Sequence, residues 1–80
     1  MRFQVGDKIK IYRDSLYIRN HVGEIGVITE LRTYGARYSK GLPTHYVVKF
    51  ECFKIPHIYM ISDLDSICDK IGPANAAPIK

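Results

Sequence analysis

The stretch His21–Leu31, HVGEIGVITEL, decides the fold because it carries two glycines inside a run of branched apolar residues. Glycine weakens a strand interior, since it packs nothing and costs more chain entropy. Val and Ile nonetheless favour a strand here. Strands of a small barrel bend sharply to close, and glycines lie where they bend or where another backbone comes close. We therefore interpret Gly23 as the turn into the strand and Gly26 as a bend or a close contact.

Apolar and polar residues also alternate in the N-terminal stretch 3–13, which predicts a half-buried strand. Ile9 and Ile11 point to one side of it, and the side chains between and after them point to the other. A tight turn at 5–7 leads into this strand. Further strands are predicted, in order, at 45–53, 57–61 and 65–71.

The connections differ in character. Residues 13–23 form a loop with polar turn residues and three large apolar ones, and residues 32–44 form a long exposed connection with two glycines and a proline. Ser62 is followed three residues later by Asp65, a capping pattern that predicts one turn of helix. Asp63 and Asp65 are explained by that turn alone.

Five short strands with no long helix predict an all-β fold: a five-stranded, mostly antiparallel barrel with one short helical turn before the last strand. The barrel is expected to span residues 1–71, with a C-terminal tail over 72–80. The expected core consists of Ile9, Ile11, Val27, Val48, Phe50 and Leu64.

The order of motifs resembles the SH3-like barrel superfamily. The motifs follow in the order VGDKIKI, a loop, VGEIGVI, a second loop, YVVKF and then ISDL. Together they cover roughly residues 3–68. Similar openings, glycine-containing strands and endings occur in small KOW-like bacterial and phage modules, so the resemblance implies a bacterial or phage origin. The motifs consist of turn and core residues, so they specify the fold more than the function.

Two further variants of the fold are similar to parts of the chain. KIKIYRDSLYIRNHVGEIGVI resembles photosystem I reaction-centre subunit IV, and GEIGVITEL, LPTHYVVKF and FKIPHIYMISDL resemble the variable chain of ferredoxin–thioredoxin reductase. The Asn-rich segment of the former and the His-Pro-rich first loop of the latter are missing here. Shared architecture with such docking subunits is an analogy and identifies no site.

Size and composition exclude several classes of protein. The chain has 80 residues and no apolar run near the roughly 20 residues of a membrane span, and its N-terminus is polar, without the apolar segment of a signal peptide. Two isolated cysteines, Cys52 and Cys68, are too few for a secreted disulfide framework. We expect free thiols, a cytoplasmic location and no membrane contact, with Cys52 packed as a small hydrophobe.

No pattern of catalytic or metal-ligating residues is found. The three histidines and two cysteines show no C-x-x-C or H-x-x-x-H spacing, and no glycine loop precedes a helix as a phosphate site requires. Cys52 and His57 have no third group to orient them as nucleophile and base. The sequence therefore predicts a protein that is not an enzyme and has no cofactor, no metal and no catalytic residue.

Net charge is +4 and lies mainly in the first half, since residues 1–20 carry five basic and two acidic groups. A modest positive field favours an acidic partner, either a protein face or a nucleic acid. Arg and Tyr dominate protein interfaces and also stack on bases. The candidate partner-binding residues are the basic and aromatic ones of the first strand and the two loops: Lys8, Lys10, Tyr12, Arg13, Tyr17, Arg19, Arg32, Tyr34, Arg37, Tyr38 and Lys40.

Two functions follow from this surface. The leading hypothesis is an accessory module that docks on another protein or a larger assembly. The alternative is KOW-like nucleic-acid binding, with the basic residues on phosphates and the tyrosines stacked on bases. The alternative requires that Lys8, Lys10, Arg13, Arg32, Arg37 and Lys40 share one face. The sequence leaves the oligomeric state open.

Overall fold

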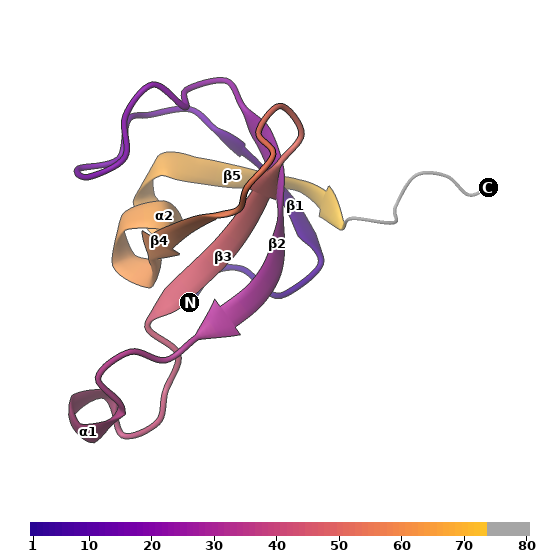
Figure 1. Ribbon diagram of the computed structural model, residues 1–80. Helices are drawn as coiled ribbons and strands as arrows, with labels where there is room; N and C mark the ends of the chain where they lie inside the picture. The colour runs from indigo at the N-terminus through magenta and orange to yellow at the C-terminus, as the bar shows by residue number, and fades with distance from the viewer. Residues whose placement is uncertain (74–80) are drawn as a thin grey trace.

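The structure is a computed structural model that describes residues 1–73, a sheet of five strands and two short helices (Figure 1). The elements follow in the order β1 (Asp7–Ile11), β2 (Ile25–Arg32), α1 (Ala36–Ser39), β3 (His45–Phe50), β4 (His57–Met60), α2 (Ile61–Ile67) and β5 (Cys68–Pro73).

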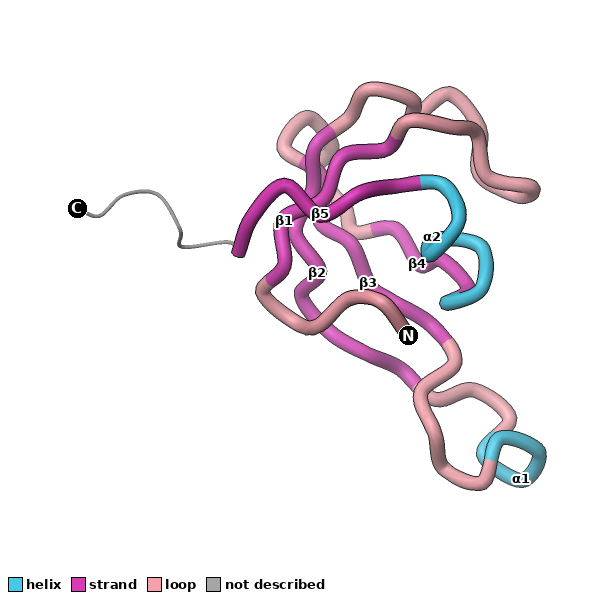
Figure 2. Tube along the Cα trace, turned by 180° about the vertical axis from the view of Figure 1, so that it is seen from behind, coloured by secondary structure: helices cyan, strands magenta, loops and turns pink. Residues whose placement is uncertain are grey.

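All strand pairs are antiparallel, and the strands lie in the order β4-β3-β2-β1-β5 (Figure 2). The predicted all-β class, the five strands and their antiparallel pairing are confirmed. The pairing leaves the sheet open, with β4 and β5 as its two edges. Helix α2 connects these two edge strands directly.

Gly23 and Gly26, before and within the central strand β2, have the roles expected of them. Gly23 has φ +92° and its N–H donates to the Ile11 carbonyl at 2.7 Å, so it forms the turn into β2. Gly26 is a close contact, because a Cβ there would lie 2.7 Å from Val48 Cγ1 and 3.1 Å from the Lys49 carbonyl oxygen. A side chain at position 26 would collide with the facing strand β3.

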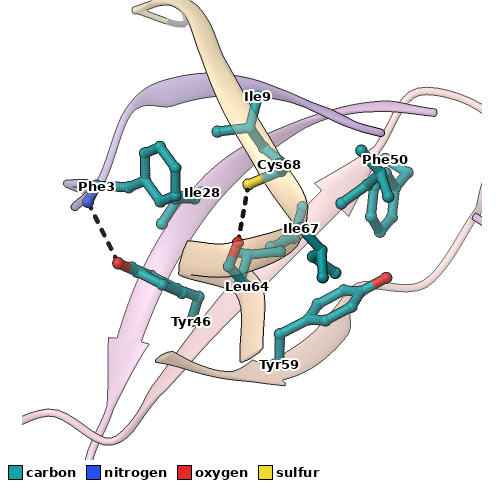
Figure 3. Packing of buried hydrophobic residues seen from close by; sticks show 11 residues of the cluster. Phe3, Ile9, Ile28, Tyr46, Phe50, Tyr59, Leu64, Ile67 and Cys68 are labelled. Atoms are coloured by element: carbon teal, nitrogen blue, oxygen red, sulfur yellow. Dashed lines mark hydrogen bonds between the residues drawn. The ribbon is translucent and has the colours of Figure 1, made fainter. Parts of the chain in front are cut away.

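One buried cluster forms the core, built from all five strands, α2 and the N-terminal segment (Figure 3). Five of the six expected core residues belong to it: Ile9, Ile11, Val48, Phe50 and Leu64. The sixth, Val27, was predicted wrongly. Gly26 and Ile28 point inward, and Val27 is only partly buried. The prediction chose the wrong face because both faces of IGVI carry apolar residues, which hides the two-residue period of the strand.

The helical turn expected at Ser62–Asp65 is confirmed and is longer than one turn, since α2 runs to Ile67. Leu64 and Ile67, three residues apart, both enter the core, which fits a helix better than a strand. The last strand therefore begins at Cys68 instead of residue 65 and ends at Pro73. Of the expected tail, residues 74–80 lie outside the described part of the chain.

Among residues 1–73, neither helix has the length and apolar character needed to span a bilayer.

Candidate docking groove

The loop between β1 and β2, residues 12–24, is called the first loop and is held against α2 by a buried polar contact. Ser15 Oγ donates to the Asp63 carboxylate, and both side chains are buried. The same Oγ accepts the N–H groups of Tyr17 and Ile18 at 3.0 and 3.1 Å. One serine thus orders the loop and ties it to α2.

This contact corrects the expectation that the capping turn alone explains Asp63. The side chain reaches across to a residue 48 positions earlier in the chain. A carboxylate this deeply buried requires hydrogen-bond donors, and Ser15 supplies one. Asp63 is therefore a structural support of the first loop.

Two hollows lie between the first loop and the β4–α2 segment. One, of about 290 Å³, is bordered by Arg13, Leu16, Ser66 and Ile67, and the other, of about 230 Å³, by Ile18, His45 and Ile58. Both hollows are bordered by Tyr17, Met60 and Asp63 and therefore lie next to each other; the two together are here called the groove.

Apolar side chains make up most of the walls of the groove. Leu16 and Tyr17 are 74% and 72% exposed, although they belong to a loop that is hydrogen-bonded in place. Ile58 and Met60 are also exposed on the opposite wall. Exposed apolar side chains gathered around a hollow indicate a binding surface, whereas the same residues scattered singly need no explanation.

The far end of the first loop is anchored in the core by His21. Its Nδ1 lies 2.7 Å from Tyr59 Oη, and its ring packs against Phe53 and, edge on, against His57, at centroid distances of 4.8 and 4.6 Å. Burial, and secondarily the nearby imidazole of His57, lowers the pKa of His21. Nδ1 of His57 is buried and has no hydrogen-bond partner among the described residues.

The connection between β2 and β3, residues 33–44, is called the arm because it projects away from the sheet in both views (Figures 1 and 2). It contains α1, which replaces part of the loop expected at 32–44. Tyr38 and Leu42 are 86% and 66% exposed, and Arg37 and Lys40 are exposed beside them. No acidic residue occurs between Glu30 and Glu51.

The structure separates the predicted partner-binding residues into three places. Lys8 and Lys10 lie on β1, on the side away from the buried Ile9 and Ile11. The first loop carries Tyr12, Arg13, Tyr17 and Arg19. The end of β2 and the arm carry the others: Arg32, Tyr34, Arg37, Tyr38 and Lys40.

Two of these cations have an acidic neighbour. Lys8 Nζ lies 3.6 Å from Glu51. Arg32 Nε donates to Glu30 at 2.9 Å, and this hydrogen bond raises the pKa of the Arg32 guanidinium above its ordinary high value. By contrast, none of the ion pairs among residues 1–73 includes Arg13, Arg19, Arg37 or Lys40.

The cysteines are free thiols in different surroundings. Cys68 is buried, and burial raises the pKa of its thiol to about 12. Cys52 was expected to pack as a small hydrophobe and is exposed instead, donating to Glu24 Oε1 at 2.8 Å, because the third strand ends at Phe50 and a turn follows. Within the described residues, His, Cys, Asp and Glu side chains form no group of three that could hold a metal.

The sequence left several residues of the groove unrecognised, namely Leu16, His45, Ile58, Met60 and Asp63, together with Ser15, which supports the loop through Asp63. The apolar run at 16–18 inside a polar loop was a usable signal for Leu16. Nothing local distinguishes Ser15 or Asp63, since their pairing joins positions far apart in the chain.

Comparisons of the chain with protein-family models, curated proteins and solved structures find no match.

Proposed function

We propose that this chain is a non-catalytic docking module that binds a segment of a partner protein in the groove. The observation that carries the proposal is the groove itself. It is apolar and bordered by a loop that one buried serine–carboxylate pair orders before any partner arrives. Pre-ordered surfaces lose less conformational entropy on binding.

The proposal includes the SH3-like barrel as the fold. Its support is topological: a long loop separates β1 from β2, a short helix separates β4 from β5, and β5 returns to pair with β1. It also includes a cytoplasmic location, where two free thiols would stay reduced.

Site-specific photo-crosslinking tests the docking function. A photoreactive phenylalanine analogue replaces Tyr17 in the groove or, as a control, Ile55, which is exposed in the turn between β3 and β4. In an extract of the organism that encodes the chain, we expect Tyr17 to capture one protein that Ile55 does not. The purified partner should then bind the wild-type chain about tenfold or more tightly than Tyr17→Ala. Equal binding by both chains contradicts the proposal.

The arm favours nucleic-acid binding as a second candidate function. Arg37 and Lys40 are free to meet phosphates, and Tyr38 exposes a ring on which a base can stack. Lys8 is engaged by Glu51 and lies on β1, so the six cations first considered are spread over three places. The candidate site is therefore smaller, and we restrict it to the arm.

Fluorescence polarisation with single- and double-stranded DNA and RNA at two salt concentrations tests this candidate. Two phosphate contacts predict a log–log salt slope of only about −1.4 to −1.8. Arg37→Ala combined with Tyr38→Ala should abolish binding. Absence of binding at low salt excludes this candidate and leaves the groove proposal unaffected.

A further inference from the structure

The first loop places exposed apolar side chains directly beside the larger hollow of the groove. It extends past α2 in both views, and the bond from Ser15 to Asp63 ties it to that helix (Figures 1 and 2). Leu16 and Tyr17 border the hollow of about 290 Å³ and are 74% and 72% exposed. An apolar projection and an apolar recess therefore lie side by side on one face of the molecule.

The larger hollow has room for one large side chain from another molecule. A cavity of about 150 Å³ is enough to hold a benzene ring. The hollow of about 290 Å³ can thus accept a tyrosine or leucine side chain like those that project next to it. Met60, which is 43% exposed, and Ile67 provide apolar walls for such a side chain. Covering these groups removes apolar surface from water, which favours association.

Charges of both signs stand at the same hollow. Arg13 and Asp14, neighbours in the chain, both border it and are both exposed. Within residues 1–73 neither of them belongs to an ion pair. The Arg13 guanidinium lies 5.6 Å from the centroid of the Tyr12 ring. Asp14 accepts the Asn20 N–H at 3.2 Å, a neutral donor that leaves the charge of the carboxylate in place.

A second carboxylate, that of Asp63, lies deeper in the hollow. It is 8% exposed and accepts a hydrogen bond from Ser15, which is also a neutral donor. One cation and two carboxylates favour neither a uniformly acidic nor a uniformly basic ligand. The matching ligand carries a cation and a carboxylate next to apolar side chains. The first loop of this chain has that combination, in the order Arg13, Asp14, Leu16 and Tyr17.

Two-fold symmetry would bring these groups together twice. In a symmetric dimer with one shared patch, residue i of each copy contacts residue j of the other. With the axis close to Tyr17, Arg13 of each copy meets Asp14 of the other, so one pair of neighbouring residues forms two ion pairs. The apolar loop of each copy then covers the larger hollow of the other. The surface around this hollow is thus complementary to itself in charge and in apolar character.

We infer that two copies of the chain associate about a two-fold axis at the first loop, each loop covering the groove of the other copy. This inference rests on the proposed function in one respect, since it adds regulation to the same groove: a partner segment must displace the second copy. The interface consists of one loop and one hollow from each copy, which is small for a protein interface. We therefore expect a weak dimer, with a dissociation constant between about 1 μM and 1 mM.

Sedimentation equilibrium of the purified chain, over concentrations up to about 1 mM, measures the association. We expect the wild type to show a monomer–dimer equilibrium. Tyr17→Ala should weaken the dimer about tenfold or more, because it removes the central aromatic side chain. Ile55→Ala, at an exposed position in the turn between β3 and β4, should leave it unchanged. A wild-type chain that stays monomeric at about 1 mM, or a dimer that Tyr17→Ala does not weaken, overturns the inference.

Exchanging the two charges tests the symmetry of the contact. Arg13→Asp replaces both ion pairs with like-charge contacts and should weaken the dimer about tenfold. Arg37→Asp makes the same change of charge on the arm and should have little effect. Arg13→Asp combined with Asp14→Arg restores opposite charges across the axis and should recover most of the wild-type affinity. If this double variant is no tighter than Arg13→Asp, the inferred pairing is overturned.

Circular dichroism of each variant checks that the fold is kept. The unmodified chain provides a test that does not depend on any substitution, because exposed ion pairs are screened by salt. The wild-type dimer should weaken as the salt concentration rises. A dimer that salt leaves unchanged or strengthens contradicts the two ion pairs and overturns the inference.

Photo-crosslinking separates this inference from the docking function. A photoreactive phenylalanine analogue in place of Tyr17 should link two copies of the purified chain, and the same analogue in place of Ile55 should not. A monomeric chain whose position 17 captures a partner in an extract overturns the inference and leaves the docking function in place. A dimer whose position 17 captures only a second copy supports the inference and contradicts the docking function. Where both hold, the purified partner should dissociate the dimer, and a partner that binds at position 17 without dissociating it overturns the inference.

Discussion

A methyl group on Gly26 would lie 2.7 Å from Val48 Cγ1, 2.9 Å from Phe50 Cδ1 and 3.1 Å from the backbone oxygen of Lys49. Two of these neighbours are packed core side chains and the third is main chain, so none can yield easily. Val27 and Ile25 beside it keep the strand propensity of the segment. The residue is a glycine because β2 and β3 approach each other here.

Gly26→Ala should therefore destabilise the fold by about 1–3 kcal/mol, the usual cost of overpacking a core. Urea unfolding followed by circular dichroism measures the change. Thr33→Ala, at an exposed position on the arm, is the control and should stay within about 0.5 kcal/mol of the wild type. Equal stability of the two variants would show that β2 and β3 can separate at no cost.

His21 makes stability depend on pH. Burial and the neighbouring His57 lower its pKa in the folded state below the ordinary value of 6.5, so the unfolded chain binds the proton more tightly. Stability from this group is thus fully present above pH 6.5 and is lost as pH falls through that value toward the lower folded pKa.

We expect the urea concentration at the unfolding midpoint to decrease when the pH is lowered from 7.5 to 5.5. The His21→Gln variant should show a smaller decrease. His45→Gln is the matched control, because His45 lies outside the aromatic cluster of His21, His57 and Phe53. A pH dependence unchanged in His21→Gln would contradict this assignment.

The near end of the first loop depends on the Ser15–Asp63 pair. Ser15 donates to Asp63 and accepts two loop amides, so its loss leaves a buried carboxylate and two N–H groups short of partners. Ser15→Ala should cost about 1–3 kcal/mol. The exchange of the Tyr17 and Ile18 amides should also quicken, which measures loosening of the loop apart from global unfolding.

Ser62→Ala is the control for this variant, since Ser62 is exposed in the first turn of α2. Its stability should stay within about 0.5 kcal/mol of wild type. If the Tyr17 and Ile18 amides exchange at wild-type rates in Ser15→Ala, the loop is ordered by something other than this contact.

The strands could be predicted because alternation and turn residues are local signals. β1, β3 and β4 lie within the expected stretches, and Ile9 and Ile11 were correctly placed inside. Where a signal was ambiguous, as in the doubly apolar IGVI, the wrong face was chosen. The groove was not predictable in the same way, because Ser15, Met60 and Asp63 meet only through tertiary packing.

The N-terminal segment is a part of the core that the expected core residues did not include. Phe3 lies before β1, yet it is 2% exposed and packs against Tyr46 at a centroid distance of 5.9 Å (Figure 3). Its N–H donates to Tyr46 Oη at 3.2 Å, and that hydroxyl donates to Asp65 at 2.7 Å. The first residues of the chain thereby connect β3 to α2.

A domain of this size has a small core and a correspondingly small stability. Phe3→Ala removes a fully buried ring and should cost about 3–5 kcal/mol, enough to unfold much of the population at 25 °C. Phe3→Leu keeps most of the apolar volume and should lower the free energy of unfolding by less than about 1.5 kcal/mol. Thermal unfolding followed by circular dichroism compares the two. If Phe3→Ala melts within a few degrees of wild type, the core of β1, β3 and α2 is complete without the N-terminal segment. Residues 1–4 then do not contribute to the stability of the fold.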